Sequence, residues 1–309
     1  MPDAATDFGP SLRDLSKPEW IAEVGDIVDT RGWIRPLGAR HLATFIEDNS
    51  TLLVTFETLQ GIQALSPLGH PLGWDLVRDQ RWSHLAVISD GDTWFRDTKV
   101  YELFDRLVDE GFFDGFDRVL FFGAGPGGYA AAAFSVAAPG ARVLAIQPQA
   151  TLDPAMTEWD NRFTHMRRTS FTDRYGYAPD MIDACERAFI IFDPRVAEDA
   201  MHAALFSGPS VTKLRLPNMG TALQTDLLHM GLLTDLIELA GKGMLTPRVF
   251  YAMARARRSH LPYLRRLLSR LDADDREPLA RRLCANVAAR LHAPRFARRL
   301  EALHDPAAE

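Results

Sequence analysis

The sequence has few cysteines and none of the residue spacings that build metal or disulfide sites. Its two cysteines, Cys185 and Cys284, are far apart among 309 residues and form no Cys-x-x-Cys pair. His41, His70 and His84 also lack the spacing of metal ligands. We therefore predict no metal site. Low cysteine usage is typical of a reducing compartment, so we expect a cytoplasmic protein.

Long apolar runs and an excess of positive charge are missing as well. No apolar stretch approaches the roughly 20 residues that span a bilayer. Residues 1–15 show no basic region followed by an apolar run, so we expect no signal peptide. The formal net charge of −6 provides no general attraction to nucleic acid or to a membrane. We therefore predict partners other than nucleic acid or membrane.

Short apolar segments alternate with helical segments through the middle of the chain. The pattern predicts six buried strands, at residues 52–56, 85–89, 119–122, 143–146, 189–192 and 211–216. Helical spacing occurs between them, at residues 101–110 and 129–138. Apolar strands that alternate with helices predict an α/β fold with a mostly parallel sheet covered on both faces. We place this domain at residues 50–243 and a covering segment at residues 1–49.

After residue 244 the composition changes. Residues 246–309 contain 14 arginines, no lysine and 7 acidic residues, which gives this segment a formal charge of +7. Because the whole chain has a net charge of −6, the remaining residues carry −13. Leucine and alanine at helical spacing predict two or three packed helices. We assign residues 244–309 to an Arg-rich helical appendage. Its arginines form either a docking surface for an acidic partner or solvated helix faces.

Residues 119–130 read VLFFGAGPGGYA, and two incompatible functions fit this stretch. An apolar strand leads into a glycine turn and then into an alanine-rich helix. Gly123, Gly125 and Gly128 match the G-x-G-x-x-G pattern of a dinucleotide-binding turn. In another register, Gly123 and Gly127 flank Gly125 as the two glycines flank the serine in the G-x-S-x-G elbow of α/β-hydrolases.

The dinucleotide interpretation lacks the acidic residue that it requires. A carboxylate should follow the next strand and hold the ribose hydroxyls, but Gln147 stands there. No redox cysteine pair is present either. We therefore predict no cofactor. An FAD- or NAD(P)-dependent oxidoreductase that uses Gly123, Gly125 and Gly128 remains an alternative.

Several segments, in order, resemble a bacterial group of α/β-hydrolase-fold proteins whose elbow reads G-S-S-M-G-G-Y-A-A. The matching segments are residues 53–56, 92–95, 123–131, 143–153, 191–193 and 214–233. The resemblance covers about residues 50–240. It implies an α/β-hydrolase-like three-layer sandwich with a mostly parallel central sheet and a cap segment at about residues 155–185.

The same resemblance implies a Ser-His-Asp triad in which two positions are empty. Gly125 occupies the nucleophile position, and glycine has no nucleophile. Asp193 occupies the acid position, with Asp199 as a second candidate. The loop at residues 217–222, where the histidine belongs, contains none, and the nearest is His229 in a helical segment.

The oxyanion hole is also incomplete in this comparison. Pro126 takes the place of the residue whose backbone N–H group normally completes the hole, and proline has no N–H group. The arginines 162, 167 and 168 form a basic cluster that either holds an anionic ligand through forked hydrogen bonds or belongs to a solvated basic loop. We expect the pocket to be lined by Phe56, Trp94, Pro126, Gln147, Arg167, Arg168 and Thr221.

Our main interpretation is therefore a catalytically degenerate α/β-hydrolase-like protein. It would act as a binding or scaffolding protein, holding a small ligand or a protein partner in the former active-site cleft. The first alternative is a hydrolase or transferase that uses non-standard catalytic residues. The second is the oxidoreductase described above.

Overall fold

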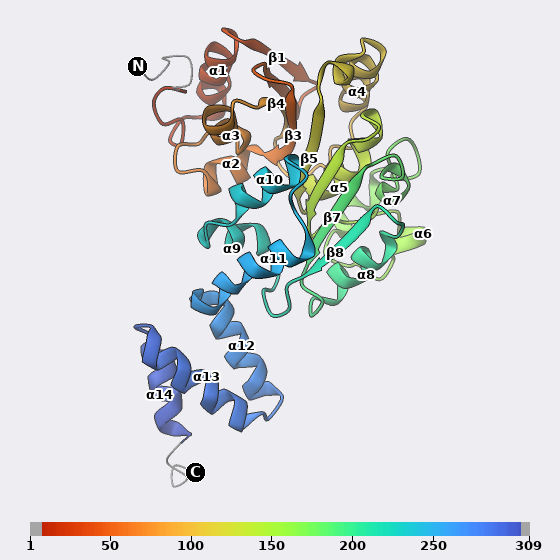
Figure 1. Cartoon of the computed structure of the whole chain (residues 1–309). Coiled ribbons are helices and arrows are strands. Elements are labelled where there is room, and N and C mark those ends of the chain that lie inside the picture. Colours follow the sequence, from red (N-terminus) through yellow and green to blue (C-terminus); the bar gives the residue numbers. More distant parts are fainter. Residues whose placement is uncertain (1–7, 304–309) are drawn as a thin grey trace.

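A computed structural model describes residues 8–303 and contains one eight-stranded sheet (Figure 1). The strand order is β1-β2-β4-β3-β5-β6-β7-β8. Six strands run parallel to one another: β3 (Thr51–Thr58), β4 (Ser83–Ser89), β5 (Arg118–Ala124), β6 (Arg142–Ile146), β7 (Arg187–Phe192) and β8 (Val211–Arg215). These are the six strands expected from the sequence, each within a few residues.

Two further strands precede the six. β1 (Gly32–Leu37) and β2 (His41–Ile46) form an antiparallel hairpin that pairs with β4 at one edge of the sheet. We had expected residues 1–49 to cover the sheet, not to extend it. Five of the six β1 residues are partly or fully exposed, so this edge strand shows no alternation of apolar and polar residues. The alternation of apolar and polar residues, from which strands are predicted, therefore gave no indication of this hairpin.

Successive side chains of each strand point to opposite faces of the sheet, and both faces pack against helices. The sheet is therefore the middle of three layers. In β5, Phe121 packs into one apolar core, while Leu120 and Phe122 pack into another. The first core includes residues of α4 (Thr98–Asp109), α5 (Pro126–Phe134), α7 (Ala178–Met181) and α8 (Ala197–Leu205). The second face is covered by α1 (Lys17–Val28), α2 (Leu59–Leu65), α3 (Gly73–Gln80), α9 (Leu223–His229), α10 (Leu233–Gly241) and α11 (Pro247–Met253). The predicted α/β-hydrolase-like fold class is confirmed.

Short helices connect these layers. They are η2 (Phe112–Gly115), η3 (Ser135–Ala137), α6 (Pro154–Thr157), η4 (Thr164–Arg168) and η5 (Ala254–Ser259). The segment expected as a cap, residues 155–185, contains α6, η4 and α7. The domain boundaries themselves stay a prediction.

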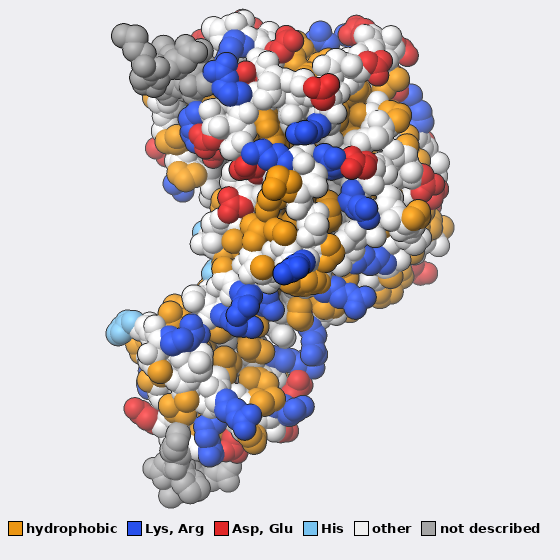
Figure 2. Space-filling model, viewed as in Figure 1, with side chains coloured by type: hydrophobic (Ala, Val, Ile, Leu, Met, Phe, Trp, Pro, Cys, Tyr) orange, Lys and Arg blue, Asp and Glu red, His pale blue; other side chains and the backbone are white. Residues whose placement is uncertain are grey.

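The C-terminal helices stand away from the sheet (Figure 1). They are α12 (Leu261–Ala273), α13 (Glu277–Arg290) and α14 (Pro294–Ala302), and they share a small apolar core around Leu268, Cys284 and Phe296. Asp226 of α9 links them to the body, because it accepts hydrogen bonds from His260 at 2.8 Å and from Arg266. The basic side chains that Figure 2 shows scattered over these helices are arginines, since residues 246–309 contain no lysine. Among residues 8–303, the structure contains no helix that is both long and apolar enough to cross a membrane.

Candidate functional site

A sharp turn at Gly125 joins β5 to α5 at the carboxyl end of the parallel sheet. Gly125 has φ 53° and ψ −121°, a conformation that costs non-glycine residues on the order of 1–3 kcal/mol. Its N–H group donates to the Ile146 carbonyl at 2.8 Å, and its own carbonyl accepts from the Tyr129 N–H group at 3.0 Å. We refer to this strand–turn–helix as the Gly125 turn.

Close packing explains two of the glycines in the turn. A Cβ atom at Gly123 would lie 2.1 Å from the Gly127 carbonyl oxygen, and one at Gly127 would lie 2.3 Å from the Phe56 carbonyl oxygen. A Cβ atom at Gly125 would meet nothing within 4 Å. The backbone angle therefore favours glycine at position 125, whereas backbone contacts require it at positions 123 and 127. These contacts account for both glycines without a bound pyrophosphate.

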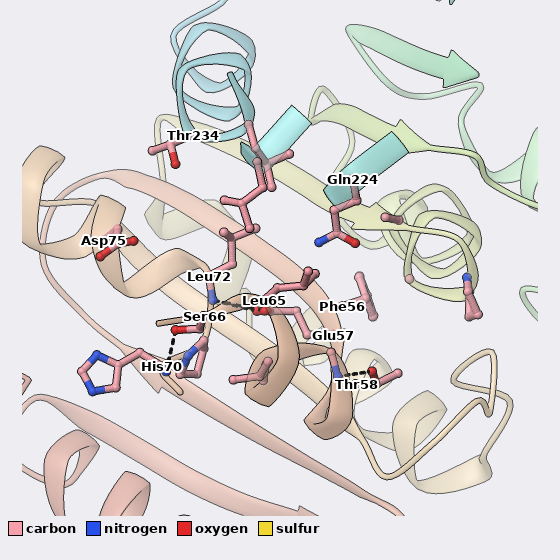
Figure 3. A pocket seen from close by; sticks show the side chains of 18 of the residues that line it. Phe56, Glu57, Thr58, Leu65, Ser66, His70, Leu72, Asp75, Gln224 and Thr234 are labelled. Carbon is pink, nitrogen blue, oxygen red and sulfur yellow. Dashed lines mark hydrogen bonds between the residues drawn. The ribbon is translucent and has the colours of Figure 1, made fainter. Parts of the chain in front are cut away.

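Two cavities meet at the Gly125 turn. The first, of about 320 Å³, is mainly apolar and is lined by Phe56, Ile62, Leu65, Leu72, Leu228 and Leu233 among others (Figure 3). The second, of about 480 Å³, is more polar and is lined by Gln147, Gln149, Arg162, Asp199, Thr221 and Thr225 among others. We call them the apolar cavity and the polar cavity. Ala124, Pro126 and Gln224 line both, so the two spaces adjoin above the turn.

Glu57 is an ionisable group in the wall of the apolar cavity (Figure 3). It follows Phe56, which pairs with Gly123 in the neighbouring strand, so Glu57 lies beside the turn. Its carboxyl oxygens accept the Leu72 N–H group at 3.1 and 3.3 Å. Burial among apolar residues raises the pKa of Glu57 to about 7, despite these hydrogen bonds. A carboxyl group with this pKa can both accept and donate a proton near neutral pH.

Two neutral side chains support Glu57 from inside the sheet. The Thr55 hydroxyl donates to Glu57 Oε1 at 2.8 Å and lies 2.9 Å from His84 Nε2. Because the hydroxyl hydrogen points to Glu57, His84 Nε2 must carry the hydrogen and donate to Thr55. Burial lowers the pKa of His84 to about 3, so this imidazole stays neutral. The chain of donors holds the Glu57 carboxyl group in one orientation.

The positions implied by the triad resemblance do not assemble into a triad. Asp193 is buried, and both of its oxygens accept backbone N–H groups, from Arg195 at 2.8 Å and from Gly220 at 2.6 Å. It therefore holds the loop at residues 217–222. His229 is the last residue of α9, and no contact joins it to Asp193 in the described chain.

The second acid candidate, Asp199, belongs to a polar network beside the polar cavity. It accepts from Arg162 Nη1 at 2.6 Å and from Gln147 Nε2 at 2.5 Å. Arg162 also binds Asp160 at 2.8 Å, and His202 Nε2 lies 2.9 Å from that carboxyl. Burial opposes ionisation of Asp160, but the hydrogen bonds from His202 and Arg162 outweigh it and lower its pKa. The network presents fixed, paired polar groups.

The structure brings together only part of the predicted pocket. Phe56 lines the apolar cavity, Pro126 lines both cavities, and Gln147 and Thr221 line the polar cavity. Trp94 is fully buried, and its indole N–H group donates to Gln149 at 3.0 Å.

The predicted basic cluster is split. Arg167 and Arg168 lie on the exposed side of η4, where Arg167 donates to Asn161 at 3.1 Å. Neither lines the two cavities, whereas Arg162 from the same cluster lines the polar one. Placing Arg167 and Arg168 in the pocket was therefore wrong, because η4 turns these two side chains outward.

Sequence reasoning missed Glu57 and Gln224. A usable signal existed for Glu57, because it directly follows an apolar strand and the carboxyl ends of parallel strands form the binding edge of such sheets. Gln224 lies on a short helix without periodicity and had no such signal.

Several non-glycine residues near these cavities have left-handed backbone angles. Phe95, in the wall of the apolar cavity, has φ 56°, and its neighbour Trp94 has φ 50°. Gln147, in the wall of the polar cavity, has φ 49°. Such angles persist only where the surroundings enforce them, and they concentrate at functional sites. Within residues 8–303 no group of three His, Cys, Asp or Glu side chains could hold a metal ion.

Comparisons with known proteins found solved structures only. No protein-family model matches the chain, and no curated protein matches it significantly. It is similar to EstE1, a thermophilic carboxylesterase cloned from a metagenomic library, with 12% identity, a TM-score of 0.41 and coverage of 78% of this chain and 98% of that one. An esterase of Pyrobaculum calidifontis has 12% identity, a TM-score of 0.45 and coverage of 75% and 93%. A carboxyl esterase of Tuber melanosporum has 14% identity, a TM-score of 0.40 and coverage of 73% and 86%.

These neighbours correct our main interpretation. A catalytically degenerate binding or scaffolding protein was expected, but several of the similar structures are those of esterases. That prediction was wrong, and the findings favour the first alternative, a hydrolase with non-standard catalytic residues. The main interpretation rested on the three triad positions alone.

Proposed function

We propose that this α/β-hydrolase-like chain is a hydrolase that cleaves an ester bond with a water molecule activated by Glu57. One observation carries the proposal: a carboxyl group with its pKa raised to about 7 lies in the wall of an apolar cavity beside the Gly125 turn. Perturbed carboxyl groups in clefts are typical of general acids and bases.

The chemistry follows from the two protonation states of Glu57. Ionised Glu57 accepts a proton from water, whose oxygen attacks the carbonyl carbon of the ester. The tetrahedral intermediate then releases the alcohol, which takes the proton back from Glu57. Water and ester become carboxylic acid and alcohol, and Glu57 returns to its ionised form. A pKa near the working pH suits both proton transfers.

Charge on the intermediate needs a stabilising group, and we assign this role to the first turn of α5. Its leading N–H groups have no partner within the helix, and the helix dipole places partial positive charge there. Pro126 contributes no N–H group, so Gly127, which lines the apolar cavity, provides the first one. With proline at position 126, the first backbone N–H donor of the helix therefore comes one residue later in the chain.

The two cavities suit the two halves of an ester. The apolar cavity matches an acyl group, because leucine, isoleucine and phenylalanine side chains form much of its wall. The polar cavity, with Arg162, Asp199 and Thr221, matches a polar alcohol. Because Pro126 and Gln224 border both, we place the scissile bond at this junction.

The test is hydrolysis of p-nitrophenyl esters of increasing acyl length by the purified chain. We expect turnover above background that Glu57→Gln reduces by 100-fold or more, in line with the usual contribution of a general base, about 10²–10⁴-fold. Asp75→Asn is the matched control, because Asp75 lines the same cavity but pairs with Arg78 at 2.9 Å. Turnover that survives Glu57→Gln unchanged would refute the role of Glu57.

A further inference from the structure

A third cavity, of about 360 Å³, lies between α1 and the β1–β2 edge of the sheet. Its walls are mainly apolar and include Ile21, Ile34, Pro36, Leu42, Leu59 and Ile88. The helix α2 separates it from the apolar cavity, since Leu59 lines one space while Ile62 and Leu65 line the other. It is therefore distinct from the site proposed for catalysis. We call it the edge cavity.

The edge cavity exists because α1 carries a glycine where it faces the sheet. Gly25 lies in the wall, and a Cβ atom added there would meet only Ile34, at 3.7 and 4.0 Å. A larger side chain at this position would project into free space. Glycine inside a helix costs roughly 0.5–1 kcal/mol relative to alanine. The chain therefore keeps this space open at a cost to helix stability.

Cationic side chains border the cavity. Arg40 donates from Nε and Nη2 to the Asp90 backbone carbonyl at 3.1 and 2.7 Å, and it forms no ion pair within the described chain. Lys17 pairs with the Asp90 carboxylate at 2.7 Å. Among the charged residues that line the cavity, Lys17 and Arg40 are cationic and Asp90 is acidic. Arg40 is exposed and can offer its remaining guanidinium N–H groups to a ligand.

We propose that the edge cavity binds a small amphipathic carboxylate. Its aliphatic chain lies among Ile21, Ile34, Leu42 and Ile88, and its carboxylate is held by Arg40. Guanidinium groups bind carboxylates through paired, charge-assisted hydrogen bonds, which explains arginine rather than an uncharged donor at this edge. An apolar space with a few placed polar groups is the usual form of a small-molecule site. This site does not depend on the proposed ester hydrolysis.

Binding of octanoate to the full chain, measured by calorimetry and thermal shift, tests the proposal. We expect saturable binding with a rise in melting temperature. Gly25→Leu, which fills the cavity, should weaken binding at least tenfold. Gly25→Ala improves the helix in the same way but adds only one methyl group, so it should retain binding.

Two further variants test the chemistry and the location. Arg40→Gln, at an exposed position, should weaken the binding of octanoate at least tenfold. It should not change the binding of octanol, which has the same chain length but no charge. Glu57→Gln should leave octanoate binding intact. The proposal is overturned if octanoate does not saturate, if Arg40→Gln affects neither ligand, or if binding is lost in Glu57→Gln but kept in Gly25→Leu. That last result would place the ligand in the apolar cavity.

Discussion

The hydroxyl group of Thr55 donates a hydrogen bond to the carboxyl group of Glu57, two residues further along β3, with the oxygens 2.8 Å apart. Residues two apart in a strand face the same side of the sheet, so the strand itself places the donor beneath the carboxyl group. The bond favours the ionised form of Glu57, whereas burial favours the neutral form and prevails. Its consequences for pH dependence can be measured.

The rate of ester hydrolysis should rise with pH through an inflection near 7, because the base must be ionised and the pKa of Glu57 is about 7. Thr55→Val removes a hydrogen bond to the ionised form and should move the inflection to higher pH. The measurement is kcat/KM between pH 5 and 9 for both proteins. A rate that stays constant over this range, as expected for the ordinary glutamate pKa of 4.5, would contradict the raised pKa of Glu57.

Through Glu57, the free energy of unfolding should fall as pH rises, whereas a salt-bridged carboxylate makes it rise. The folded protein binds this proton more tightly than the unfolded chain, so stability falls as pH rises from about 4.5 to about 7. At 1.36 kcal/mol per unit of pKa, the loss reaches about 3 kcal/mol above pH 7. Glu57→Gln should therefore stabilise the protein at pH 8 and leave it nearly unchanged at pH 4.5.

Urea unfolding at the two pH values measures this difference. Glu102→Gln is the control, because Glu102 is an exposed residue that pairs with Lys99 at the surface. Equal effects of Glu57→Gln at both pH values would contradict the pKa shift.

Gly125→Ser should destabilise the protein by about 1–3 kcal/mol, because a side chain at φ 53° is strained even where space is free. Gly115→Ser is the matched control, since Gly115 has equal space and no positive φ. The new serine should not react with a serine-directed phosphonate, because loop 217–222 offers no histidine to activate it. Thermal unfolding and inhibitor labelling check both points. Rapid labelling would reveal a base that we have not identified.

Asp193→Ala should cost more stability than Asp193→Asn. Alanine leaves the N–H groups of Arg195 and Gly220 without acceptors, and each such buried group costs about 1–3 kcal/mol. Asparagine keeps one acceptor oxygen. Chemical denaturation of both variants gives the comparison. Equal losses would mean that the loop at residues 217–222 does not depend on these hydrogen bonds.

FAD, NAD and NADP should not stabilise the protein, because Gln147 stands where the carboxylate that holds the ribose is required and a backbone contact accounts for Gly123. A ligand at about 100 times its dissociation constant stabilises a fold by about 2.7 kcal/mol, which thermal shift detects readily. A clear shift with any of the three, lost in Gly128→Val, would revive the dinucleotide interpretation.

The sequence by itself determined the layers of the fold and the turn at its centre. Apolar runs such as residues 119–122 are long enough only for buried strands, and the alternating helices dictate parallel pairing. The glycines at positions 123, 125 and 127 indicate a tight strand–helix turn, because backbone contacts leave no room for a side chain at positions 123 and 127 and the backbone angle favours glycine at position 125. These properties depend on neighbours in the chain, and so local patterns reveal them.

Only the tertiary structure decided what surrounds the turn. The pKa of Glu57 is raised because residues distant in sequence bury its carboxyl group, and this burial outweighs the opposing hydrogen bond from the Leu72 N–H group, 15 residues later. The edge cavity depends on α1 lying over a hairpin whose exposed strand has no periodic pattern. Burial and cavities arise from packing between elements distant in sequence. No single segment therefore encodes them, and reading the triad positions alone led to the wrong function.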